Sequence, residues 1–449
     1  MTPRILFAGT ASGSGKTTAT CAVLTLLKRR GVKVKSCKCG PDYIDPMFHA
    51  AVLSVPCTNL DPFFCDGALM RYLLKENAGD DLTVIEGVMG YYDGTGETGT
   101  KNSTFTVASE TGTPVILVID GKGAAASLLA VIEGFLRFAP NSGVKGVLFN
   151  RMKPHIYQSI CSMMRTSFKD EVIPVGYIPE FSEDYRIPSR HLGLVTAGEI
   201  AGLTEKINAI TDLCENTVEI DKIISLAQTA VEIADTAPVI PALPPVNIAV
   251  AKDAAFCFYY AETLRLFEKM GAVLLPFSPL NNEPVPPTAD GLLLGGGYPE
   301  LYAERLEKNI ISKESVRLAV TGGMPTIAEC GGFQYLGETL DGKAMCGVLP
   351  HESRNAGKLT RFGYVTLTAK KDGLLGPAGT TLRGHEFHYW DSTDPGDGFT
   401  AEKPNGKSWD CVVSTQTLYA GYPHLYLYAN ISAAKAFYRI CLAYRENRK

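Results

Sequence analysis

The sequence predicts an α/β protein of two domains, each built on a largely parallel, doubly wound sheet. The chain has 449 residues, more than one hydrophobic core usually organises. Short apolar runs alternate with longer segments of helical periodicity in both halves, as in doubly wound sheets. Four prolines within residues 237–245 interrupt this alternation, because they cannot continue a helix or a central strand. We therefore predict a first domain over 1–236, a Pro-rich linker over 237–246 and a second domain over 247–449.

The strands expected in the first domain are short, and helical segments follow them. Val115–Ile119 is apolar throughout, as a strand buried on both faces should be. The other expected strands are Arg4–Ala8, Val32–Cys37, Leu82–Glu86 and Val144–Phe149. The expected helices include Thr17–Arg30, Gly123–Phe138 and Ile223–Ala234.

The second half repeats this rhythm and ends in runs that are richer in aromatic and β-branched residues. The strands expected at its start are Asn247–Ala251, Ala272–Pro276, Gly291–Leu294 and Thr326–Glu329. The later β-type runs are Arg361–Thr368, Thr381–Tyr389 and Leu425–Tyr428.

Composition excludes several classes of protein. The formal net charge is −4 and charged residues make up 20% of the chain, which argues against bulk attraction to nucleic acid or anionic lipid. No apolar run reaches the roughly 18 residues of a membrane span, and the N-terminal run is too short for a signal peptide. The twelve cysteines lack zinc-site spacing and read as reduced, mostly buried side chains. We expect a cytoplasmic protein that binds small molecules, neither nucleic acid nor membrane. The sequence leaves open whether the protein forms a homodimer.

Residues 9–18 read Gly-Thr-Ala-Ser-Gly-Ser-Gly-Lys-Thr-Thr between an expected strand and helix. Such a loop aims backbone N–H groups at a phosphate beside the positive end of the helix dipole. Lys16 would reach the β- and γ-phosphates, and the Thr17 hydroxyl would bind Mg²⁺. The usual motif has glycine where Thr10 stands; here the glycine is Gly9, as in a variant P-loop. The predicted ATP-binding residues are Thr10, Ser12, Gly13, Ser14, Gly15, Lys16, Thr17 and Thr18.

Carboxylates at strand ends could complete this site. Glu86 ends an apolar strand, at the edge where α/β sheets bind ligands. Asp42 and Asp45 follow the second strand, and Asp93 lies in the loop after Glu86. For the three aspartates the alternative is a turn or capping role.

Cys330 lies between an expected strand and helix, in Ala-Glu-Cys-Gly-Gly-Phe-Gln. A sharp turn there would expose the sulfur, and the helix N-terminus would favour the thiolate. A thiol nucleophile needs a base, and spacing alone does not choose among His385, His388 and His424. The glycines after Gly291–Leu294 could supply oxyanion-hole N–H groups, which we assign to Gly296 and Gly297.

These motifs, taken together, resemble a known family. The Cys-x-Gly-x-Gln pattern at Cys330 resembles class I glutamine amidotransferases. The phosphate loop, Lys38–Pro46 and Glu86–Gly94 resemble the cobyrinic acid a,c-diamide synthases of cobalamin biosynthesis. Arg190–Leu194, the Gly-Gly-Gly-Tyr-Pro-Glu loop and His385–Tyr389 belong to the same pattern, which runs in order through both domains.

The resemblance implies a fold and a reaction. The first domain is similar to dethiobiotin synthetase, and the second to class I glutamine amidotransferase domains. The family uses MgATP to phosphorylate the c and then the a acetate of cobyrinic acid, and ammonia from glutamine displaces the phosphate. Tyr426 stands where many class I enzymes have a Glu two residues after the histidine, so a Cys–His pair is implied. By position, the resemblance makes Cys330 the nucleophile and His424 its base. It also implies two further sets of residues. Contacts to the substrate are implied for Lys38, Asp42, Tyr43 and Asp93, and ligands of Mg²⁺ for Thr17, Asp42 and Glu86.

Several alternatives stay open. Hydrogenobyrinic acid and nickel-sirohydrochlorin a,c-diamide synthases share these motifs, and the residues do not separate the three macrocycles. Cobyric acid synthase has the same architecture, but the Gly-Pro-Asp-Tyr-Ile-Asp-Pro stretch fits the a,c enzymes better. From a different class, the chain could be a P-loop nucleotide switch that binds a partner. A strained thiol would have no use in such a protein.

Overall fold

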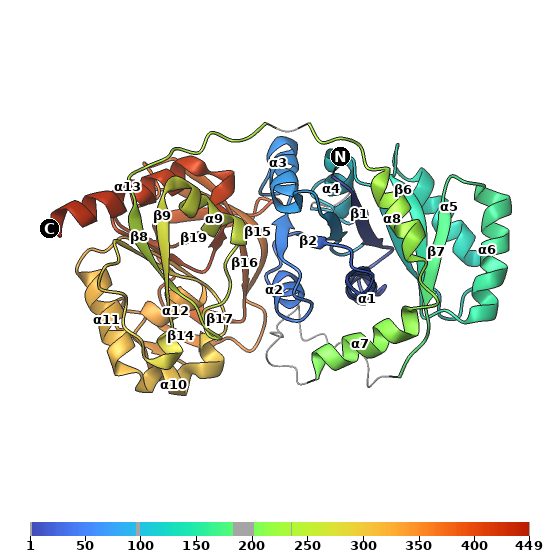
Figure 1. Ribbon diagram of the computed structural model, residues 1–449. Coiled ribbons are helices and arrows are strands. Elements are labelled where there is room, and N and C mark those ends of the chain that lie inside the picture. The colour runs from blue at the N-terminus through green and yellow to red at the C-terminus, as the bar shows by residue number, and fades with distance from the viewer. Residues whose placement is uncertain (1, 96–98, 183–201, 235, 449) are drawn as a thin grey trace. The chain divides into compact units, whose positions relative to one another are not determined.

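The computed structural model describes residues 2–95, 99–182, 202–234 and 236–448, and it divides the chain into two compact units (Figure 1). The first covers Met1–Ala237 and the second Pro238–Lys449. Each is an α/β unit with a mainly parallel central sheet, so the predicted fold class is confirmed. Among the described helices, none has the length and apolar character needed to cross a membrane. Arg190–Leu194 of the family pattern lies outside the described residues.

The sheet of the first unit is parallel throughout its described strands, in the order β3-β2-β4-β1-β5-β6-β7. Its strands are β1 Arg4–Gly9, β2 Val34–Cys39, β3 Cys57–Leu60, β4 Leu82–Glu86, β5 Val115–Asp120, β6 Val144–Asn150 and β7 Ile173–Ile178. Its helices are α1 Lys16–Arg29, α2 Ile44–Ala51, α3 Gly67–Ala78, α4 Thr104–Thr111, α5 Ser127–Arg137, α6 Pro154–Phe168, α7 Leu203–Cys214 and α8 Ile220–Gln228.

Helices cover both faces of this sheet. Helices α1, α7 and α8 share one hydrophobic core with alternate residues of the strands. Other strand residues meet the remaining helices: Asn77 of α3 contacts Cys37, and Phe149 packs edge-on against Tyr157 of α6. Because β1, β2 and β4 are parallel neighbours, their carboxyl ends lie at one edge, where the phosphate loop, Lys38 and Glu86 are placed.

The second unit has a six-stranded sheet in the order β20-β21-β11-β10-β8-β9, parallel except for edge strand β20. Its strands are β8 Val246–Ala251, β9 Ala272–Phe277, β10 Gly291–Leu294, β11 Thr326–Glu329, β20 Val413–Ser414 and β21 Leu418–Gly421. The helices of this unit are α9 Ala261–Met270, α10 Ala303–Lys308, α11 Ile310–Thr321, α12 Gly331–Leu336 and α13 Ile431–Asn447.

Two smaller sheets complete the second unit, in the orders β19-β18-β15-β16-β22 and β13-β12-β14-β17. The first contains β15 Arg361–Ala369, β16 Thr381–His388, β18 Phe399–Glu402, β19 Ser408–Cys411 and β22 His424–Leu425. The second contains β12 Thr339–Leu340, β13 Lys343–Ala344, β14 Glu352–Asn355 and β17 Trp390–Ser392. Strand β22 pairs with β16, which fixes the backbone at His424.

Four expected elements differ from the structure by two or more residues. Helix α5 begins at Ser127 rather than at Gly123, because residues 123–126 are not helical. Strand β2 begins at Val34 because Val32 still bonds back to Leu27 in the turn after α1, so Lys38 lies within the strand. Helix α8 ends at Gln228, and the segment beyond it is extended; the Arg4 side chain binds the carbonyl of Val231. The expected strand Leu425–Tyr428 is wrong beyond Leu425, since Leu427–Ala429 forms a 3₁₀ turn.

Candidate functional site

The phosphate loop joins β1 to α1 and folds back closely on its own start. A β-carbon at position 9 would lie 2.3 Å from Ser14 Oγ and 2.9 Å from Lys16 Nζ. The shifted glycine of the motif is therefore needed here because the loop and its lysine pass directly over it. Lys16 Nζ donates to the carbonyl of Ala11 at 3.2 Å. Burial, followed by the charge of Lys38, lowers the pKa of Lys16 to about 8, and an anionic ligand would raise this pKa again.

A buried ion cluster lies beside the loop, centred on Glu86. Residues Lys38 and Glu86 are register partners on parallel strands, which places their side chains next to one another. Lys38 Nζ lies 3.0 Å from Glu86 Oε1 and 2.5 Å from Asp45 Oδ2. Thr17 Oγ1 donates to the same Glu86 oxygen at 2.6 Å. Although burial opposes it, Lys38 holds the pKa of Glu86 well below its usual range, and the carboxylate stays ionised.

His49 contacts the other oxygen of the Glu86 carboxylate. His49 Nε2 lies 3.2 Å from Glu86 Oε2, and its Nδ1 is 3.1 Å from Ser36 Oγ. The side chains of His49 and Glu86 are completely buried. A histidine held on both ring nitrogens fixes the orientation of the carboxylate, as outer-shell partners do in metal sites.

The other predicted acidic residues also organise their own loops. Asp42 Oδ1 accepts the Ile44 N–H at 2.8 Å, and Asp93 Oδ2 accepts the Gly90 N–H at 2.8 Å. These bonds fit the alternative turn and capping roles. Burial and then the neighbouring Asp45 carboxylate raise the pKa of Asp42. Tyr43 is buried at the start of α2, next to Asp42.

Cys330 occupies the turn between β11 and α12. Its backbone has φ 47° and ψ −101°, a conformation that costs a non-glycine residue on the order of 1–3 kcal/mol. The turn is held because Cys330 N–H donates to the Gly421 carbonyl at 2.8 Å and its own carbonyl accepts the Gln334 N–H at 3.0 Å. The strand, strained turn and helix form the predicted nucleophile elbow.

The helix N-terminus favours the Cys330 thiolate through the Gly331 N–H, as expected, but other effects on the thiol pKa outweigh it. Burial, and next the Glu300 charge, raise the pKa of the thiol above its usual value, and the Gly331 N–H opposes this only in part. Helix α12 spans only six residues. The thiol therefore stays protonated until a base takes its proton.

His424 and the glycine loop lie against each other, and the loop also approaches the residue after Cys330. A β-carbon on Gly296 would be 2.4 Å from His424 Cε1, so only glycine admits the ring there. The N–H nitrogen of Gly297 is 3.3 Å from the place of a β-carbon on Gly331, the residue after Cys330. The loop with both predicted oxyanion donors thus contacts the histidine on one side and the elbow on the other.

The other two candidate histidines are held by packing. His388 stacks on Tyr422 with ring centroids 3.8 Å apart, and its Nδ1 lies 2.5 Å from the Trp390 carbonyl oxygen. His385 lies opposite His424 in the β16–β22 pair. Burial lowers the pKa of His388 to about 4 and that of His385 to about 3. These contacts favour His424 as the base.

Comparison with known proteins matches each half of the chain to a known domain family. Residues 5–195 match the CobQ/CobB/MinD/ParA nucleotide binding domain, and residues 247–430 match the CobB/CobQ-like glutamine amidotransferase domain. The cobyrinate a,c-diamide synthase of Listeria monocytogenes is 39% identical over 443 residues, covering 96% of this chain and 97% of that protein. Those of Priestia megaterium and Thermoplasma volcanium are each 36% identical, covering 99% and 100% of this chain and 98% and 99% of theirs. The chain belongs to the cobyrinate a,c-diamide synthase family.

Family membership confirms the resemblance that the motifs predicted. A member of the cobyrinate a,c-diamide synthase family with both domains is a glutamine-dependent ligase that forms amides. Its nucleotide-binding domain contains the phosphate loop and Glu86, and its amidotransferase domain contains Cys330 and His424.

Three residues at the sites were not among the predicted ones. Asn150 ends β6, and its Nδ2 donates to the Ser14 carbonyl at 3.0 Å. His49 and Glu329 contact Glu86 and His424. Asn150 and Glu329 are polar residues at the ends of apolar strands, a signal that could have identified both. His49 lies within a helix and carries no such signal.

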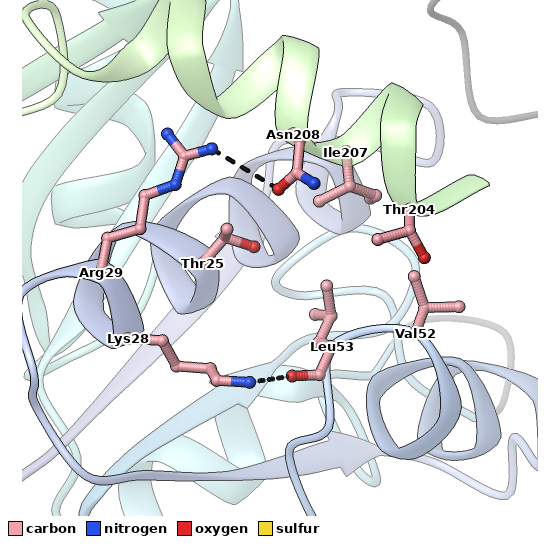
Figure 2. Close-up of a pocket in the computed structure, with 8 residues that line it drawn as sticks. All are labelled: Thr25, Lys28, Arg29, Val52, Leu53, Thr204, Ile207 and Asn208. Atoms are coloured by element: carbon pink, nitrogen blue, oxygen red, sulfur yellow. Dashed lines mark hydrogen bonds between the residues drawn. The ribbon is translucent and has the colours of Figure 1, made fainter. Parts of the chain in front are cut away.

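A described cavity of this family member lies away from the phosphate loop. Its volume is about 320 Å³ (Figure 2). Its lining residues are Thr25, Lys28, Arg29, Val52, Leu53, Thr204, Ile207 and Asn208. Lys28 and Arg29 belong to the C-terminal end of α1, about 20 Å along the helix from the phosphate loop. The cavity contains none of the predicted site residues.

Proposed function

We propose that the protein amidates the a and c acetate carboxylates of cobyrinic acid, using MgATP to activate each carboxylate and glutamine as the nitrogen source. The names of the relatives support the corrinoid substrate. The observation that carries the proposal is that one chain combines a buried Lys38–Glu86–Thr17 cluster at a phosphate loop with a strained cysteine whose preceding residue contacts His424.

The residues of the first unit fit a magnesium nucleotide. Thr17 and Glu86 place a hydroxyl and an ionised carboxylate together, the donor types that Mg²⁺ prefers. Within the described residues, the buried atoms Ser14 Oγ and Asn150 Oδ1 have no hydrogen-bond partner, so the loop can still bind a polar ligand. We assign the nucleotide phosphates to the N–H groups of residues 10–18 and to Lys16, and the Mg²⁺ to Thr17 and Glu86, with Asp42 as a further candidate. Bound Mg²⁺ would offset charge on the transferring phosphoryl group.

Activation is chemically required because a carboxylate has no adequate leaving group for attack by ammonia. Transfer of the γ-phosphoryl group to the substrate carboxylate would give an acyl phosphate and ADP. Ammonia then attacks the acyl carbon and phosphate leaves, forming the amide. We assign Lys38, Asp42, Tyr43 and Asp93 to the handling of the substrate carboxylate and the phosphoryl group.

The second unit supplies the ammonia. His424 takes the proton of the Cys330 thiol, and the thiolate attacks the glutamine side-chain amide. The N–H groups of Gly296 and Gly297 stabilise the oxyanion of the tetrahedral intermediate. His424 returns the proton to the amide nitrogen, and collapse of the intermediate releases ammonia and leaves a glutamyl thioester, which water hydrolyses to glutamate.

Mass spectrometry of products from cobyrinic acid, glutamine and MgATP tests this proposal. We expect two amide gains, lost in Lys16→Ala. Hydrolysis of ATP and glutamine with no nitrogen joined to the macrocycle would contradict it. With ¹⁸O in the substrate carboxylate, one ¹⁸O should appear in the released phosphate if an acyl phosphate forms.

Parallel reactions with hydrogenobyrinic acid and nickel-sirohydrochlorin identify the macrocycle, since the alternative substrates differ in the ring rather than in the reacting carboxylates. ATP and glutamine are metabolites of the cytoplasm, which we propose as the location. Glutaminase activity that survives Cys330→Ala would instead favour the nucleotide-switch alternative.

A further inference from the structure

The carboxylate that many class I amidotransferases place two residues after the catalytic histidine is replaced here by Tyr426. Its ring is buried and packs edge-on against Tyr260 at 5.1 Å. A carboxylate from another strand lies next to the histidine: Glu329 Oε2 is 3.5 Å from His424 Nδ1. We propose that Glu329, the residue before the nucleophile, is the positioning residue for His424 in glutamine hydrolysis. This inference rests on the proposed roles of Cys330 and His424.

The backbone fixes the Glu329 carboxylate in this position. Glu329 is the last residue of β11 and is the register partner of Gly421 on β21. The next peptide group is held too, because Cys330 N–H donates to the Gly421 carbonyl. The second carboxylate oxygen, Oε1, accepts the Leu425 N–H at 3.1 Å. One carboxylate therefore contacts both the imidazole of His424 and the backbone of the following residue.

The contact between the Glu329 carboxylate and the His424 ring lies in a mostly buried environment. The side chains of His424 and Glu329 are only 4% and 14% exposed, so water screens their interaction weakly. Gly296 lies against the ring, and the ring of Phe258 meets it at 66°. The other titratable group facing it across a strand pair is His385, which burial keeps neutral. Glu329 thus places an anion in contact with the ring.

The contact suits the chemistry of a general base. An anion at Nδ1 favours the tautomer that carries its proton there, which leaves Nε2 to accept the thiol proton. It also stabilises the imidazolium that forms when the thiolate attacks. The 3.5 Å separation is long for a hydrogen bond, but catalytic hydrogen bonds often shorten when substrate binds.

Glu329 could instead serve only to hold the Leu425 backbone. Glu329→Gln separates the two roles, because the amide oxygen can still accept the Leu425 N–H while the negative charge is lost. Glu329→Asp keeps the charge on a shorter side chain. Each variant of the full chain is compared with wild type in glutamine hydrolysis between pH 5 and 9. Amide formation from ammonium chloride, cobyrinic acid and MgATP measures the other half of the reaction.

We expect Glu329→Gln to lower the kcat of glutamine hydrolysis by roughly 10- to 100-fold, with KM changed less than about threefold. Glu329→Asp should recover part of the rate. Amide formation from ammonium chloride should stay within about twofold of wild type in both variants.

Unchanged glutamine hydrolysis in Glu329→Gln would overturn the inference. An equal loss of glutamine- and ammonia-driven amide formation would overturn it too, since that pattern indicates a general structural defect. The Cys330→Ala variant distinguishes failure of this inference from failure of the proposed function. Glutamine hydrolysis that is absent in wild type, or that persists in Cys330→Ala, rejects both ideas. Hydrolysis that requires Cys330 but is indifferent to Glu329 rejects only the positioning role.

Discussion

The phosphate-loop site and the thiol site both begin where a buried parallel strand ends and a helix starts, but they hold their reactive groups differently. At the first, Lys38 is clamped between Asp45 and Glu86, and opposite charges balance within a few ångströms. At the second, a strained backbone presents Cys330, and burial, followed by the neighbouring carboxylates, disfavours its thiolate. The first site is organised by charge and the second by shape.

This difference indicates when each site becomes reactive. Lys38 and Glu86 stay ionised before any ligand arrives, and a nucleotide would bring its charges to groups already in place. In the proposed reaction, the thiol stays neutral until His424 removes its proton. Changes of charge should therefore damage the first site most, and changes of volume the second.

The largest effects should separate the two sites completely. Cys330→Ala should reduce glutamine-driven amide formation by about 10³-fold or more, since the nucleophile is gone, while ammonia-driven formation continues. Lys16→Ala should abolish both amide-forming reactions and leave glutamine hydrolysis measurable. The two substrates are assayed in parallel on each variant. If Cys330→Ala also stopped the ammonia-driven reaction, the division of labour between the sites would be wrong.

A change of charge without a change of size tests the ion cluster. Glu86→Gln removes the counter-charge of Lys38, so we expect ammonia-driven amide formation to fall by roughly 10²- to 10³-fold. Glutamine hydrolysis should not change. Glu133→Gln, an exposed carboxylate on α5, is the matched control and should leave both rates within about twofold. A Glu86→Gln enzyme as active as this control would remove Glu86 from the site.

A change of volume without a change of charge tests the thiol site. Gly296→Ala places a methyl group against the His424 ring, so glutamine hydrolysis should fall by roughly 10- to 100-fold. Gly134→Ala, in helix α5 with open space around the position, is the control and should have no effect on either rate. Steady-state kinetics with glutamine and with ammonium chloride distinguish the outcomes. Equal losses with both nitrogen sources would mean that the methyl group disturbs the fold.

The smallest effect concerns stability. Burial lowers the pKa of His388 to about 4, against about 6.5 in an unfolded chain. As pH falls from about 6.5 to 4, the unfolded state gains a proton that the folded state excludes, so His388 lowers stability across that window. His388→Phe keeps a ring against Tyr422 and should reduce the slope of unfolding free energy against pH by up to about 1.4 kcal/mol per unit. Denaturant unfolding at several pH values measures this slope, and an unchanged slope would show that His388 does not titrate on unfolding.

Much of the fold could be predicted because the signals are local. The central strands β4, β10 and β11 have their predicted bounds, since each is a short apolar run with a clear break at both ends. The segment after α8 was mispredicted because its structure depends on contacts with Arg4, more than 200 positions away in the sequence. The strand predicted at Leu425–Tyr428 was too long because alternation cannot show where a partner strand stops.

The site residues show the same contrast between local signals and long-range contacts. Motifs identified the phosphate loop and Cys330, whose chemistry depends on contiguous residues. His49 and Glu329 act through partners 37 and 95 positions away, so only the folded sheets reveal their contacts. The Lys38–Glu86 pair could be read from strand register once β2 was correctly placed.

The positive φ of Cys330 has a consequence for selection and engineering. Glycine is the residue that best tolerates this backbone conformation, so Cys330→Gly should relieve strain while it removes the nucleophile. A screen that rewards heat tolerance alone would thus enrich inactive chains at this position. Selection for thermostable variants must therefore include turnover of glutamine, because at this turn durability and catalysis favour different residues.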